Sequence, residues 1–254
     1  MIAMTDVGTH TWVDLTGGQL TGAERRTFLR PLARTHAVNA VGRLSMLARL
    51  NTGRRAHVDP ARLTPPSSAL TRAAVERAER LLTPALLNHS YRTFAFGAAL
   101  GAVEGRPVDL ELLFTAALLH DTGLPTSDRN VDFTRNSARI AQEVAEQVGL
   151  STAATEIIRT AITLHHSPGV TPGHGPVAYL LSAGAAVDVI GVRSWQLPPD
   201  VLASVVGQHP RFGFKREFSA AFRDEAARVH RGRAQFLRRY GALDLAIKLA
   251  PFRD

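Results

Sequence analysis

The sequence contains no cysteine among its 254 residues. This absence excludes disulfide bridges and thiolate metal ligands, so a bound metal would have to use histidine and carboxylate side chains. Long apolar runs are absent too: the longest covers residues 177–187, ends before Asp188 and is too short to span a bilayer. No positively charged start precedes an apolar stretch, so we expect no signal peptide, a cytoplasmic location and no membrane partner.

Lysine is scarce, since only Lys215 and Lys248 among the 30 basic residues are lysines. The net charge of +8 is distributed unevenly: residues 1–62 carry +5, residues 63–210 carry −3 and residues 211–254 carry +6. The basic charge therefore lies on the two flanks, and aromatic residues make up only 6% of the chain. Basic flanks without a recognisable motif are weak evidence for nucleic-acid binding, which we do not expect.

Apolar residues recur at helical spacing along the chain, and no stretch alternates as a strand would, so we predict an all-α protein. Residues 1–60 are predicted to be a tail followed by a helical extension from Thr21, with a break or kink near Pro31. Residues 61–254 are predicted to form the main domain, which ends in a basic helix over about 215–240. The apolar positions expected to pack in the extension are Val38, Val41, Leu44, Leu47 and Leu50.

Polar side chains interrupt three apolar helical stretches. His120 and Asp121 end the run at residues 112–124, and His89 and Asp188 lie in similar settings. An ionised carboxylate against apolar surface is costly unless a partner or a metal compensates it. In the order His, His-Asp, Asp, three helices can converge on one ion with two imidazoles and two carboxylates, which suits Zn, Fe, Mn, Co or Ni. A hydrogen-bonded core network without metal is the alternative.

This pattern resembles the HD-domain metal-dependent hydrolases. NHSYR at 88–92, ALLHDTGL at 117–124, LHHSPG at 164–169 and APF at 250–252 are similar to the cyanamide hydratase branch. The resemblance covers about residues 60 to 253 and implies an HD-domain helical bundle. It also implies one divalent transition metal, with Zn or Fe as the first candidates and Mn, Co or Ni as alternatives. The implied ligands are His89, His120, Asp121 and Asp188.

The implied chemistry is that of a hydrolase or hydratase (a lyase), in which a metal-bound hydroxide attacks a small substrate such as cyanamide or a related nitrile. Asp121, as ligand or adjacent base, and His165 would manage the proton, and His166 would contact the substrate. Histidines favoured at a helix C-terminus by the helix dipole are the alternative for both histidines. Thr134 stands where plant and fungal cyanamide hydratases carry an acidic residue, which bears on the substrate assignment.

Other functions stay open at this point. A phosphohydrolase acting on a nucleotide or other phosphomonoester would need cations, and the candidates are Arg92, Arg129, Arg193 and Lys215. Arg92 lies one helical turn from His89 and would contact the substrate or pair with an acid. A non-catalytic binding protein stabilised by its metal is the alternative outside enzymology. The partner that we expect is a small-molecule substrate, and self-association as a homo-oligomer is left open.

Overall fold

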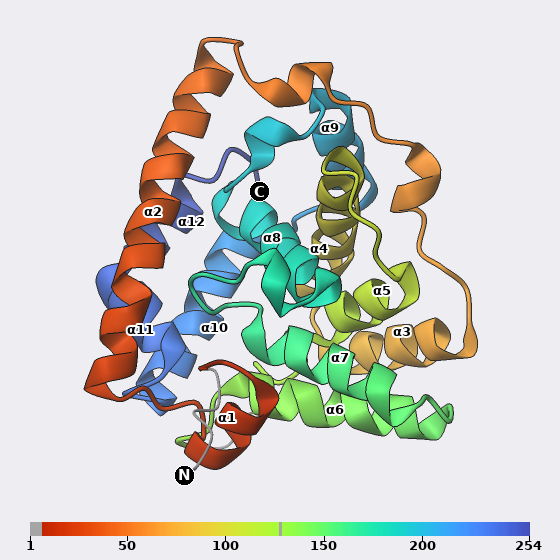
Figure 1. The fold of residues 1–254 in the computed structure, drawn as a ribbon, viewed down its shortest axis with the longest axis vertical. Coiled ribbons are helices and arrows are strands. Elements are labelled where there is room, and N and C mark those ends of the chain that lie inside the picture. The colour runs from red at the N-terminus through yellow and green to blue at the C-terminus, as the bar shows by residue number, and fades with distance from the viewer. Residues whose placement is uncertain (1–6, 127–128) are drawn as a thin grey trace.

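The computed structural model describes residues 7–126 and 129–254, and all regular elements within these ranges are helices, as predicted (Figure 1). The α-helices are α1 (His10–Thr16), α2 (Gly22–Leu47), α3 (Ala69–Leu81), α4 (Pro84–Val103), α5 (Leu110–Leu119), α6 (Phe133–Gln147), α7 (Thr152–Leu164), α8 (Pro176–Ile190), α9 (Pro199–Gln208), α10 (Phe214–Arg228), α11 (Arg233–Tyr240) and α12 (Leu243–Lys248). Four short 3-10 helices join them: η1 (Thr52–Arg55), η2 (Pro60–Leu63), η3 (Pro172–His174) and η4 (Ser194–Gln196). No helix of the described ranges is long and apolar enough to cross a membrane.

Helices α4 and α8 pack closely at the centre of the fold because glycine lies at their contact. A Cβ atom on Gly184 of α8 would lie 2.1 Å from the carbonyl oxygen of Thr93 on α4. One on Gly97 of α4 would lie 2.7 Å from the carbonyl oxygen of Leu180. His89 is one turn before Thr93, and Asp188 is one turn after Gly184, so this close approach brings the two polar residues together across the helix pair.

The end of α5 is held against α6 by a second close contact. Every residue from Leu112 to Leu119 is buried, which makes α5 a core helix. A Cβ atom on Gly123 would lie 2.1 Å from the carbonyl oxygen of Phe133, and the Gly123 amide donates to Ser137 Oγ at 2.8 Å. The turn that carries His120 and Asp121 is therefore pinned inside the protein.

The N-terminal flank differs from the prediction. Residues 7–20 include the capped helix α1, where only a tail was expected, and α2 continues through Pro31 as one helix. Residues 1–6 of the predicted tail lie outside the described residues. The apolar positions expected to pack are exposed on α2 and just beyond it, namely Val38, Val41, Leu44, Leu47 and Leu50. Helix α2 runs along one side of the molecule (Figure 1) and packs through Phe28 and Leu32 instead. The domain boundary near residue 60 stays a prediction.

The single basic helix predicted over 215–240 is wrong, because α10 and α11 are separate helices. Helix α10 ends at Arg228, and Gly232 precedes α11 with an extended backbone. The break turns Arg233 into the core, where Arg233 Nη2 lies 3.0 Å from Asp132 Oδ2. Because both side chains are at most 2% exposed, a buried ion pair is formed at the point where the predicted helix is interrupted.

Candidate metal centre

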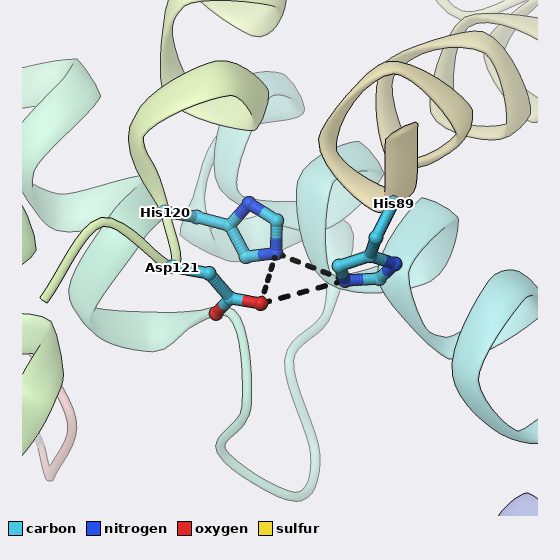
Figure 2. Close-up of side chains that lie close together, drawn as sticks. All are labelled: His89, His120 and Asp121. Atoms are coloured by element: carbon cyan, nitrogen blue, oxygen red, sulfur yellow. Dashed lines mark hydrogen bonds and ion pairs between the residues drawn. The ribbon is translucent and has the colours of Figure 1, made fainter. Parts of the chain in front are cut away.

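Three of the predicted ligands converge in the interior (Figure 2). His89 comes from α4, and His120 and Asp121 come from the turn after α5. The Nε2 atoms of His89 and His120 are 3.3 Å apart. Asp121 Oδ2 lies 3.3 Å from His120 Nε2 and 3.6 Å from His89 Nε2. All three side chains are buried, so their ligand atoms form a compact triangle inside the protein.

The backbone fixes the proton of the His120 ring. His120 Nδ1 lies 2.7 Å from the carbonyl oxygen of Ala117, which can only accept, so Nδ1 carries the proton. Burial lowers the pKa of His120, although the nearby Asp121 opposes this effect, and the ring is therefore neutral near pH 7. A neutral ring with its proton on Nδ1 presents a lone pair at Nε2, the atom that faces the triangle.

Asp188 orients the second imidazole. Its Oδ2 atom lies 2.7 Å from Nδ1 of His89. Burial alone would raise the pKa of Asp188, but Arg92, His89 and Arg211 together hold it well below its usual value, so the carboxylate is ionised. It therefore accepts the proton of His89 Nδ1, and Nε2 is the ring nitrogen of His89 that lies toward His120.

The residues of the triangle fit a divalent transition metal. The Nε2 atoms of two imidazoles face each other, and neither carboxylate oxygen of Asp121 accepts a hydrogen bond from the described residues. A cation would compensate all three groups at once, whereas an unpartnered buried carboxylate is costly. Ligands about 2.0–2.1 Å from a tetrahedral ion are about 3.3–3.4 Å from one another, close to the separations of 3.3 and 3.6 Å in this triangle.

Asp188, the fourth predicted ligand, does not join this group. Its carboxylate contacts the Nδ1 edge of His89, whereas the converging atom is Nε2. Arg92 donates from Nε to Oδ1 at 2.8 Å and from Nη2 to Oδ2 at 2.9 Å, and Arg211 also donates to Oδ1. The carboxylate is thus compensated by two guanidinium groups without a metal. The carboxylate lies where it can orient the His89 ring, and its role as a metal ligand stays a prediction.

Arg92 does not occupy the position of a substrate contact. The side chain is fully buried, pairs with Asp188 and donates from Nη1 to the carbonyl oxygens of His209 and Pro210 at 2.8 and 3.2 Å. It does not line the cavity that reaches the triangle. Of the two roles weighed from the sequence, pairing with an acid is the one that the structure shows.

His165 lies beside the triangle, at the end of α7. Its Nδ1 atom lies 2.7 Å from the carbonyl oxygen of Ile162, and its Nε2 atom lies 3.7 Å from Asp121 Oδ1. Burial, and then the neighbouring His120 and His166, place the pKa of His165 well below its usual value. The ring is therefore neutral, with its lone pair at Nε2, and can accept a proton there.

His166 contacts a second buried network. Its Nε2 atom lies 3.6 Å from Asp132 Oδ2, and its ring stacks on Phe133 with centroids 5.0 Å apart. Burial and the nearby Arg233 lower the pKa of His166. Arg233 also donates to Thr134 Oγ1 at 2.8 Å. The threonine that departs from the cyanamide hydratase pattern is thus part of this network, and a substrate contact by His166 stays a prediction.

Three aromatic residues of α10 lie beside the site but were not among the predicted site residues. Their regular spacing in the sequence was a signal that they share one face of a helix. Phe214, Phe218 and Phe222 recur every four residues and therefore share one face of α10. Phe214 stacks on His89 with centroids 4.6 Å apart and an interplanar angle of 25°. Phe218 and Phe222 line the cavity. Arg211, whose guanidinium lies 4.9 Å from the centroid of Phe214, carried no comparable signal.

A cavity of about 1020 Å³ reaches the triangle. Its wall includes His89, His120, Asp121, His165 and His166. The residues of the triangle and His165 therefore border the same cavity. Cavities of several hundred Å³ that combine apolar walls with a few convergent polar groups are typical of small-molecule sites. The site can therefore admit a substrate next to the ion that the triangle would hold.

Residues 86–206 match the family model described as HD domain, which confirms the resemblance recognised in the sequence. Two proteins of Saccharomyces cerevisiae, "Cyanamide hydratase DDI2" and "Cyanamide hydratase DDI3", are each 26% identical to this chain over 172 residues. Each match covers 65% of this chain and 76% of the yeast protein. Together these similarities support a metal-dependent hydrolase or hydratase of the HD superfamily.

Glu225 of α10 is a buried acid near this site, and we expect it to make the stability of the fold depend on pH. Burial and the nearby Asp132 raise the pKa of Glu225 to about 6, although it accepts from the Phe133 amide and from Arg228. A raised carboxyl pKa means that the fold is stabilised by protonation, and this stability is lost as pH rises from the usual value of 4.5 through about 6. At pH 7.5 the ionised form costs on the order of 2 kcal/mol.

The Glu225→Gln variant should remove this loss, because the amide stays neutral and its oxygen can still accept from Phe133. Between pH 5 and pH 7.5 we expect it to gain about 1 kcal/mol relative to the wild type, because part of the loss already falls below pH 5. Urea unfolding at the two pH values measures this difference. Glu146→Gln, at an exposed position of α6, is the control. An unchanged pH dependence in Glu225→Gln would show that Glu225 does not titrate in this range.

Proposed function

We propose that this protein adds water to a neutral small molecule, with a nitrile of the cyanamide type as the model substrate. The observation that carries the proposal is the triangle of two imidazole Nε2 atoms and the Asp121 carboxylate, which accepts no hydrogen bond from the described residues, at a cavity wall. A divalent ion held by His89, His120 and Asp121 would lower the pKa of a coordinated water and polarise the substrate. Zn and Fe are the first candidates for this ion.

Each residue around the triangle then has a role. His165 would take a proton at Nε2, since its Nδ1 proton is held by the carbonyl oxygen of Ile162. Asp121, 3.7 Å away, would hold the reacting water or substrate within reach of that nitrogen. Asp188 would fix the orientation of the His89 ring from the Nδ1 side, and Phe214 would fix it from one face.

None of the four cations weighed from the sequence supplies a free charge for a phosphomonoester beside the triangle, although Arg30 and Arg34 of α2 line the cavity at exposed positions. Of the four cations considered for phosphate binding, only Arg193 lines the cavity, and it pairs with Glu104 and donates to Tyr179 and Gln196. Arg92 is held by Asp188. A phosphate group in this site would therefore lack a free cation from this set, whereas a nitrile needs none.

The test compares two reactions of the purified chain after its metal content has been measured. With cyanamide, water adds across the carbon–nitrogen triple bond and the product is urea. We expect urea to form, to disappear after chelation and to return with the metal. We expect no phosphate release from nucleotides or other phosphomonoesters. Phosphate release without urea formation would favour the phosphohydrolase. One bound ion per chain with neither reaction would favour the non-catalytic binding protein.

A further inference from the structure

The cavity is far larger than cyanamide requires. Its volume of about 1020 Å³ lies at the upper end of the range typical of sites for drug-sized ligands. At about 30 Å³ per molecule, this space corresponds to roughly 30 waters, whereas cyanamide has three non-hydrogen atoms. A molecule of that size would leave most of the cavity to solvent, and its position beside His165 would be poorly defined.

Away from the triangle, the wall of the cavity is mostly apolar. Small and branched residues of α8 form one part, including Ala186, Val189 and Ile190. Aromatic and leucine side chains of α10, α11 and α12 form another part, and Phe222 and Leu237 belong to it. The polar groups that the proposed reaction uses gather at the triangle and His165. Such an arrangement suits a ligand with one reactive polar group and an apolar remainder.

The charges of the cavity wall also favour an uncharged ligand over a cationic one. Asp121 is the only acidic side chain in the described wall, and it belongs to the proposed metal site. The arginines of the wall are Arg30 and Arg34, at exposed positions of α2, and Arg193, which pairs with Glu104. No acid of the described wall is thus left to balance a cationic ligand, and the buried part of the wall offers apolar surface to an uncharged one.

The apolar part of the cavity is shared between α8 and the flanks of the chain. The segment that matches the HD-domain model, residues 86–206, supplies the triangle and His165. Helix α2 before this segment and helices α10, α11 and α12 after it complete the wall. Figure 1 shows α2 on one side of the molecule, with α10, α11 and α12 beside it. Part of the apolar wall is therefore a feature of this chain beyond the matched segment.

We propose that the substrate of this site is a neutral molecule in which a small hydratable group, of which a nitrile is the model, is attached to a bulky apolar body. This inference rests on the proposed function. For a nitrile the reaction is balanced by water alone: the oxygen bonds to the nitrile carbon, both hydrogens end on nitrogen, and a primary amide forms. The triangle and His165 act on the polar group, and α8 and the flanks together bind the apolar body.

A series of unbranched aliphatic nitriles, from acetonitrile to octanenitrile, tests this inference by calorimetric titration of the purified full chain. Burial of each added methylene should strengthen binding by about threefold to fourfold until the cavity is filled. In Ala186→Phe, a phenyl ring would occupy part of the cavity, and octanenitrile should bind at least about tenfold more weakly. Conversion of cyanamide to urea and of each nitrile to its amide is measured in parallel.

If Ala186→Phe fails to fold, two matched variants on α2 provide the same test. Ala37 and Ala40 are both exposed on this helix, but only Ala37 lines the cavity. Ala37→Trp should weaken octanenitrile binding, and Ala40→Trp should not change it. Equal affinity for short and long nitriles would overturn the inference, even if cyanamide is hydrated and the proposed function stands. Affinity that rises with chain length while neither cyanamide nor any nitrile is hydrated would support the binding of a bulky apolar body and overturn the proposed function.

Discussion

Replacing Asp188 with alanine should lower the free energy of unfolding by about 3–5 kcal/mol. The reason is that Arg92 and Arg211 share this carboxylate, and both guanidinium groups would stay buried without it. Their side chains are 0% and 1% exposed. Urea unfolding of the purified variant measures the loss. The asparagine variant should also be destabilised, since an amide keeps the shape but cannot neutralise two cations.

Asp200→Ala is the control for this experiment, because Asp200 is an exposed acid in the first turn of α9. It should change stability by no more than about 0.5 kcal/mol. The experiment also separates two roles of Asp188. A variant that unfolds at the wild-type urea concentration but has lost its metal would identify Asp188 as a direct ligand, and the arrangement around His89 would then have to change.

The second large effect is expected from His120→Ala, which removes one corner of the triangle. Because loss of even an outer partner of a ligand costs about 10–100-fold in metal affinity, loss of a ligand should cost more than about 100-fold. Bound metal should fall from about one equivalent per chain to a small fraction, as measured on acid-digested protein. Formation of urea from cyanamide should fall with it.

We also expect the wild type and His120→Ala to differ in how much added metal stabilises them. An ion that binds only the folded wild type adds about 4 kcal/mol at a thousandfold excess over its dissociation constant, whereas His120→Ala should gain nothing from added metal. His174→Ala is the matched control, since His174 is exposed in η3 and lies outside the described metal cluster. Full metal content in His120→Ala would contradict the site, and so would loss of metal in His174→Ala.

The ligand triangle could be predicted from the sequence because its signal is local. His89, His120 and Asp121 each interrupt an apolar helical stretch, and such an interruption is visible without knowledge of the fold. Helix starts were predictable for the same reason: Thr83 and Asp109 cap α4 and α5 with their side chains. The match to the HD-domain model over residues 86–206 agrees with this part of the prediction.

The charge pairs around the site could not be predicted, because they join residues that are distant in the sequence. Asp188 pairs with Arg92 and Arg211, and Asp132 pairs with Arg233, yet neither pairing produces a periodic pattern. Asp188 was assigned to the metal on its setting in an apolar helix and on the resemblance to the HD-domain pattern, neither of which reveals these arginines. The prediction that the apolar face of α2 is packed was wrong for a related reason. Periodicity predicts which residues share a face of a helix, but not whether another element covers that face.

The division of the cavity wall between the matched segment and the flanks bears on how this protein can diverge. Substitutions in α2, α10, α11 or α12 can alter the shape of the chamber while His89, His120 and Asp121 stay in place. Part of the selectivity would thus reside outside the stretch of the gene that carries the chemistry. Related proteins that share the central segment need not accept the same compounds, and exchanging the flanks between them would be a direct route to new specificities.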